Sequence, residues 1–142
     1  MRISYIVWML FLTIGSYQDI RRKEISGKLL IMMGVSGTII QIFEKSVSPG
    51  SWFLGVILGI VLLFLGFMTR ESIGYGDGWL VLVMGMSLGF GFSFFSFLLG
   101  LGVSALVSGW LLMYKRVKRK YRIPFAPFLW IGCLMCLPVY QL

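Results

Sequence analysis

Histidine is absent from this 142-residue chain, and cysteine occurs only twice. Without histidine there is no serine–histidine or cysteine–histidine nucleophile, and the most common zinc ligand is missing. Cys133 and Cys136 form one Cys-x-x-Cys pair inside an apolar run, with no second pair to complete a metal site. We interpret them as part of a packed helix face, and we expect no metal and no cofactor.

Charged residues are also scarce, at 13% of the chain against roughly 25% in soluble domains, while 58% of the residues are hydrophobic. No polar stretch is long enough to form a separate soluble domain. The composition therefore predicts one integral membrane domain, residues 1–142. A net charge of +8 would suit nucleic acid, but in a membrane protein basic residues set the orientation, so we expect no nucleic-acid partner.

Hydrophobic residues gather in six runs of helix-like length, which predict an all-α polytopic membrane protein of about six transmembrane helices. A spanning helix usually has about 20 residues, within a range of roughly 17–25, and the first, second and fourth runs fall below that range. The fourth run has the least defined end, near Gly89, Gly91 and Ser93, and a re-entrant segment is its alternative. The runs are Ile3–Tyr17, Leu29–Phe43, Trp52–Met68, Trp79–Phe90, Phe94–Tyr114 and Phe125–Leu142.

Basic residues are unevenly divided between the connections. Eleven of the 13 lie in the first, third and fifth connections, and the other side holds only Arg2 and Lys45. Because basic residues favour the cytoplasm, we expect the odd connections to be cytoplasmic and both termini to lie outside. The first run is followed, not preceded, by a basic cluster, which is the wrong charge order for a cleaved signal peptide, so we expect it to stay as the first span.

Glycine and serine recur at four-residue spacing in the later runs. Small residues at that spacing let membrane helices approach closely, and we interpret them as helix-packing positions that could bring the first and fourth helices together. The positions are Gly55 and Gly59, Gly85 and Gly89, and Gly100, Ser104 and Ser108.

Aspartate occurs twice, as Asp19 after the first run and as Asp77 before the fourth. Both would lie at the cytoplasmic face, where an acid at membrane depth is costly and suggests a function. Two carboxylates that share a site cannot both ionise cheaply, so one acts as a base on water while the other holds a proton. That chemistry hydrolyses a peptide bond without metal or histidine. Gly74 and Gly76 would offer an open backbone edge to an unwound substrate.

Three other interpretations of these residues stay open. Asp77 could be the N-cap of the fourth helix, and Asp19 could pair with the basic residues that follow it. The two acids could instead form a proton or cation relay in a transport protein. The chain could also be a structural subunit whose basic loops bind anionic membrane lipid.

Three ordered segments carry a resemblance to a known family. Gly74-Tyr75-Gly76-Asp77 resembles the Gly-x-Gly-Asp signature of membrane aspartyl proteases. The segment from Asp19 to Ile25 resembles the first aspartate segment of type IV prepilin peptidases, including preflagellin peptidases, although Ser26-Gly27 replaces the usual Pro-Asn. Ile123-Pro124-Phe125-Ala126-Pro127-Phe128 is similar to the Pro-Phe-Gly-Pro segment that opens the last helix, with Ala126 for glycine.

The resemblance implies an aspartic endopeptidase with Asp19 and Asp77 as catalytic residues and Gly74 and Gly76 as motif glycines near the substrate. Its substrates would be prepilin-like proteins with a short basic leader and a hydrophobic helix, cut just after a glycine at the cytoplasmic face of the cell membrane. Larger members carry two Cys-x-x-Cys pairs in a cytoplasmic segment linked to N-methylation. Nothing here matches that segment, so the resemblance implies a peptidase without a methyltransferase domain.

Overall fold

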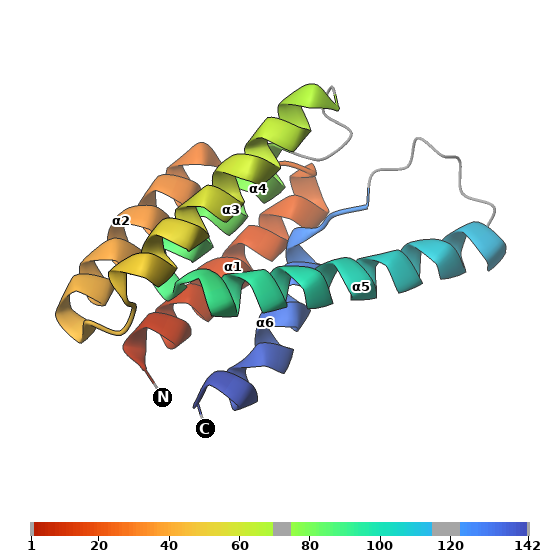
Figure 1. Ribbon diagram of the computed structural model, residues 1–142. Coiled ribbons are helices and arrows are strands. Elements are labelled where there is room, and N and C mark those ends of the chain that lie inside the picture. The colour runs from red at the N-terminus through yellow and green to blue at the C-terminus, as the bar shows by residue number, and fades with distance from the viewer. Residues whose placement is uncertain (1, 70–74, 115–122, 142) are drawn as a thin grey trace.

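The computed structural model describes residues 2–69, 75–114 and 123–141, and the regular structure within these ranges is entirely α-helical. The described ranges contain six helices, which follow one another as Figure 1 shows. The prediction of an all-α fold with six helices is confirmed. Their bounds are α1 (Ile3–Arg22), α2 (Gly27–Glu44), α3 (Pro49–Met68), α4 (Tyr75–Leu88), α5 (Phe90–Tyr114) and α6 (Ala126–Gln141).

Three of the helices in the described ranges, α2, α3 and α5, are long and apolar enough to cross a membrane, and residues 126–140 form a shorter apolar helix. Large apolar side chains such as Leu10, Phe64 and Leu106 lie exposed on the outside of the bundle. Contiguous apolar surface of this kind is tolerated in hydrocarbon and not in water. The chain is therefore a membrane protein with several candidate spans. At about 1.5 Å per residue α4 is only about 21 Å long, so its crossing of the bilayer stays a prediction, as does that of α1.

The helices that carry the two aspartates extend further than the apolar runs suggested. α1 continues past Tyr17 to Arg22, and α4 begins at Tyr75, four residues before Trp79. Asp77 therefore lies inside the first turn of α4, and the N-cap interpretation of this residue was wrong. A helix can continue into polar residues at its ends. The apolar runs therefore predicted only the hydrophobic part of α1 and α4.

The break between α4 and α5 is the single residue Gly89, which defines the helix end that the sequence left open near Gly89, Gly91 and Ser93. Gly89 has φ +85°, a left-handed conformation that glycine adopts without a steric penalty. The hydroxyl of Ser51 on α3 accepts a hydrogen bond of 2.9 Å from the backbone N–H of Phe90. Since this hydroxyl satisfies an N–H at the start of α5, the helix can begin at Phe90 and not at Phe94.

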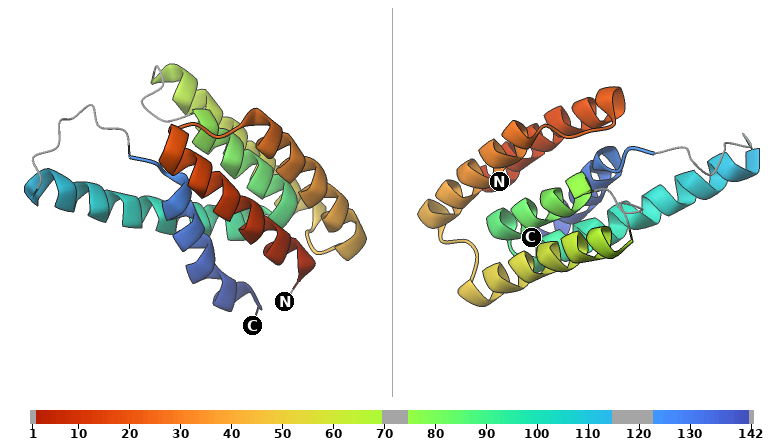
Figure 2. Two further views of the ribbon diagram at one scale, coloured as in Figure 1. Left: turned by 180° about the vertical axis from the view of Figure 1, so that it is seen from behind. Right: turned by 90° about the horizontal axis from the view of Figure 1, so that it is seen from above.

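α4 is the most enclosed helix of the bundle, and the core is built around it. The side chains of Leu80, Val81 and Met84 are fully buried. Leu80 and Met84 belong to the same core cluster as Leu12 of α1 and Leu129 of α6. α2 and α3 pack on either side of α4, as the view from above shows (Figure 2). The first turn of α4, which carries Asp77, is thereby held by several neighbouring helices.

Glycines allow α3 and α4 to pack closely against each other. A Cβ added at Gly55 of α3 would lie 2.6 Å from the backbone oxygen of Gly85 on α4, and one added at Gly78 would lie 2.9 Å from the Leu63 side chain. The packing role predicted for Gly55, Gly59, Gly85 and Gly100 is thus confirmed. Gly55, Gly59 and Gly85 join α3 to α4, and Gly100 meets α6. Their nearest neighbours do not lie on α1, so these glycines do not bring α1 and α4 together as expected.

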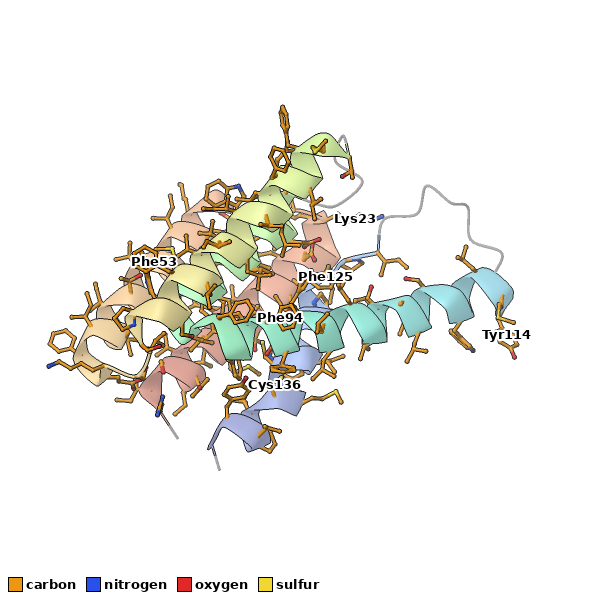
Figure 3. The ribbon with its side chains drawn as sticks, viewed as in Figure 1. Lys23, Phe53, Phe94, Tyr114, Phe125 and Cys136 are labelled. Carbon is orange, nitrogen blue, oxygen red and sulfur yellow. The ribbon has the colours of Figure 1, made fainter. Side chains whose placement is uncertain are left out.

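Both termini lie at one end of the bundle, while Lys23 at the end of α1 and Phe125 at the start of α6 lie at the other end (Figures 1 and 3). The antiparallel succession of helices brings the start of α4 to this second end as well. The segments that contain Asp19, Asp77 and Phe125 therefore meet at the same end of the molecule. The end of α1, with Arg21, Arg22 and Lys23 exposed, makes this end basic.

We expect Gly55→Ala to reduce the stability of the protein by about 1–3 kcal/mol, the usual cost of overpacking, because its Cβ would meet α4 backbone that cannot move aside. Thermal unfolding in detergent, followed by circular dichroism, measures the change. Gly102→Ala on α5 is the matched control, because a Cβ there has no atom within 4 Å. An equal melting temperature for the two variants would contradict this account of the α3–α4 contact.

Candidate active site

Asp19 lies in the last turn of α1, on the face that points into the core. This face carries Tyr5, Trp8, Leu12 and Gly15 at alternating spacings of three and four residues, and all of them are buried. Asp19 continues the same spacing and is 7% exposed. It is the one buried charged residue among those the structure describes. The apolar stripe of α1 thus ends in a carboxylate that faces the interior of the bundle.

The start of α6 supplies a hydrogen bond to this carboxylate. The backbone N–H of Ala126 donates to Asp19 Oδ2 at 3.0 Å, and the bond is buried. Ala126 is the first residue of α6, where backbone N–H groups have no partner within the helix and the helix dipole favours negative charge. The next residue, Pro127, has no N–H, so the amide of Ala126 is the available donor at this point of the helix.

Phe125 and Ala126 are held firmly enough to keep this amide in place. Both side chains are buried, and the Phe125 ring packs edge-on against Phe97 of α5 with ring centroids 5.8 Å apart. The Phe125 carbonyl accepts hydrogen bonds from the N–H groups of Phe128 and Leu129. The Pro-Phe-Ala-Pro-Phe segment therefore holds the Asp19 carboxylate in a fixed position. The hydrogen bond joins residues that are 107 positions apart in the chain.

Asp77 occupies a similar position on α4. It lies in the first turn of that helix and is partly buried. Leu80, Val81 and Met84 follow it at three, four and seven residues, so they share its helix face, and all three are fully buried. The face that carries Asp77 thus points into the same core that α1 faces with Asp19.

The linker between α1 and α2 connects the two aspartate segments. Ile25 packs over Gly76, where an added Cβ would lie 3.8 Å from Ile25 Cδ1. The Gln18 side chain accepts a hydrogen bond of 3.2 Å from the backbone N–H of Ser26, which holds the linker close to the end of α1. Gln18, next to Asp19, thus binds the linker at Ser26, and Ile25 of the linker packs against Gly76, next to Asp77.

The structure therefore brings Asp19 onto the Ala126 segment by a direct hydrogen bond, and it brings the Asp19 segment onto Gly76 through Ile25. Gly74, the other motif glycine, lies outside the described residues. Ile25 and Ala126 belong to the segments that resemble the family, but the sequence did not predict these contacts. It gave no role to Gln18. Pro127, which has no N–H, was the one sequence signal that could have pointed to the Ala126 N–H as a hydrogen-bond donor.

Metal-ligating side chains do not gather anywhere in the described ranges: no three His, Cys, Asp or Glu residues there lie close enough together to hold an ion. Cys133 and Cys136 are free thiols buried in the core, where the Cys133 sulfur lies 3.7 Å from that of Met84. The interpretation of the Cys-x-x-Cys pair as a packed helix face is confirmed.

Among known proteins, only a family model matches this chain. No curated protein and no solved structure matches the chain significantly. Residues 6–139, however, match the type IV leader peptidase family. The match includes all three segments described above and nearly all of the six-helix bundle. The chain therefore belongs to the type IV leader peptidase family and is an aspartic prepilin leader peptidase.

Proposed function

We propose that this enzyme uses Asp19 and Asp77 as its catalytic pair and removes the short basic leader of prepilin-like proteins at the cytoplasmic face of the membrane. The observation that carries the proposal is that both carboxylates continue buried helix stripes that face one core, at one end of the bundle. Gly74 and Gly76 are proposed to lie beside the substrate backbone. The domain is proposed to comprise the whole chain and to act without a methyltransferase domain.

The two carboxyl groups divide the chemistry of peptide hydrolysis. One carboxylate takes a proton from water, which attacks the carbonyl carbon of the scissile bond, while the other carboxyl group donates its proton to the reacting peptide. When the C–N bond breaks, the leaving amine takes up a proton at the same site. The pair titrates as a unit, so acid and base are not assigned to single residues.

The surroundings of Asp19 suit this role. The Ala126 N–H stabilises negative charge on Oδ2 and fixes the direction of the carboxyl group. A pre-positioned carboxyl group lowers the cost of reaching the reactive geometry.

We expect Asp19→Asn and Asp77→Asn each to reduce cleavage of a prepilin by at least about 100-fold, because neither amide can accept or donate the catalytic proton. The double variant should be no slower than either single variant, since the two residues act as a unit. Initial cleavage rates at matched protein amounts measure both effects, with leader loss followed by mass.

Two further variants separate chemistry from folding at this position. Asparagine retains a side-chain oxygen that can accept the Ala126 hydrogen bond, so Asp19→Asn should purify and melt like the wild type. Asp19→Ala removes that oxygen and should also lower the melting temperature, because it leaves a buried N–H without its acceptor. Glu24→Gln, an exposed change in the neighbouring linker, is the activity control. Substantial cleavage by either asparagine variant would falsify the catalytic assignment.

Activity should persist in EDTA and after treatment with thiol reagents, because the proposed mechanism uses only carboxyl groups and both cysteines are buried. The rate of leader removal before and after each treatment is the measurement. A loss of turnover in EDTA that one added metal ion restores would rule out an aspartate-only mechanism.

Orientation can be tested with single cysteines at the two ends of the bundle. We expect Ser48→Cys to react with a membrane-impermeant thiol reagent added outside intact cells, and Lys23→Cys to react only after permeabilisation. Both native residues are exposed, so accessibility to water does not differ between them. Labelling of Lys23→Cys from outside would place the basic end on the wrong side of the membrane for this proposal.

A further inference from the structure

An apolar groove lies between α2 and α4 and has a volume of about 490 Å³. Its walls are residues of α2 between Leu30 and Ile39 and residues of α4 between Trp79 and Met86. The groove opens outward, because Ile31, Val35 and Trp79 along it are about half exposed or more. Thr38, its one hydroxyl-bearing residue, donates that hydroxyl to the Gly34 carbonyl. The surface left for a ligand is therefore hydrocarbon.

The α4 wall of this groove leads directly to the candidate active site. Trp79, Val83 and Met86 lie on one face of α4 at spacings of four and three residues. Three residues before Trp79, the same face carries Gly76, the motif glycine next to Asp77, and Ile25 covers it. The groove thus runs along α4, and Trp79 at one end of it lies about one helix turn from Gly76 on the same face.

We propose that the groove between α2 and α4 binds the hydrophobic helix of the prepilin substrate, with the start of that helix beside Gly76. The inference rests on the proposed function, because it takes the cleavage point to lie just ahead of the hydrophobic segment. A helix seated in the groove brings its first residues to the level of Asp77. The leader then continues over the first turn of α4 toward the two carboxyl groups.

The dimensions of the groove suit one face of a helix. From Leu30 to Ile39, α2 rises about 14 Å, and a helix of that length and about 10 Å diameter occupies roughly 1,100 Å³. The groove volume of about 490 Å³ accepts the side chains of one face and leaves the other face in lipid. Gly34 has no side chain to fill the groove, where an added Cβ would lie 3.7 Å from the Val83 side chain.

The opening of the groove also matches the state of the substrate. A prepilin whose hydrophobic helix is already in the bilayer can reach the groove sideways, without passing through water. An apolar groove binds such a helix by packing, as membrane helices bind one another. A soluble peptide without that helix makes no use of the groove.

Val35→Trp fills the groove and tests the proposal kinetically. We expect it to raise the KM for a membrane-anchored prepilin by about tenfold, the effect of excluding one apolar side chain from a pocket, with little change in kcat. Cleavage of a soluble peptide that contains the leader and cut site without the hydrophobic helix should not change. Val61→Trp is the matched control, because Val61 is similarly exposed on α3 and does not line the groove.

Cross-linking identifies the occupant directly. In an Asp77→Asn background, Val35→Cys should form a disulfide with a cysteine placed in the hydrophobic helix of an uncut prepilin, and Val61→Cys should not. Equal cross-linking of the two positions, or capture only of a second copy of this chain, overturns the proposal. So does a normal KM for Val35→Trp, which is the result expected if only lipid fills the groove.

The two proposals fail in different ways. If the wild-type protein cleaves neither the anchored prepilin nor the soluble peptide, the proposed function is wrong and the docking site is lost with it. If the wild type cleaves both and the two tryptophan variants behave alike, the active site stands and only the docking site is wrong.

Discussion

Burying a carboxylate among apolar helices is costly unless hydrogen bonds replace the water that it loses, and this cost governs how α1 and α6 are arranged. Asp19 recovers one such bond from the Ala126 amide. The start of α6 must therefore stand against the end of α1, and Pro127 and the buried Phe125 ring hold it there. Asp19, the buried charged side chain in the described core, thus accepts a hydrogen bond from the first backbone N–H of α6.

Much of this arrangement could be predicted from the sequence. The apolar runs indicate six helices in a membrane, and the order of the polar connections places both aspartates and the Pro-Phe-Ala-Pro-Phe segment at one end. Hydrophobic patterns could not predict that α4 begins at Tyr75 or that α5 begins at Phe90, because the first depends on neighbouring helices and the second on Ser51. The contact of Asp19 with Ala126 joins distant segments, so no local pattern contains it.

The glycines near the site have separate physical roles. Gly78 and Gly85 let α3 approach α4, Gly76 leaves room for Ile25, and Gly34 lowers one wall of the lateral groove. The first turn of α4 is thus enclosed by α3 on one side, while the groove beside α2 leaves another side accessible to lipid. The proposed function and docking site use this combination: polar chemistry at the end of the bundle, and an apolar approach from the side for a substrate helix in the bilayer.

The central claim is that Asp19 and Asp77 form one site, and their separation tests it most directly. The chain contains no other aspartate, so protein labelled with carboxyl-¹³C aspartate contains a single pair of labelled side-chain carboxyl carbons. Solid-state NMR in lipid bilayers measures the distance between these two carbons through their dipolar coupling. The account predicts a separation within about 7 Å, the reach of two carboxyl groups that share one water. A separation well beyond that reach would contradict it.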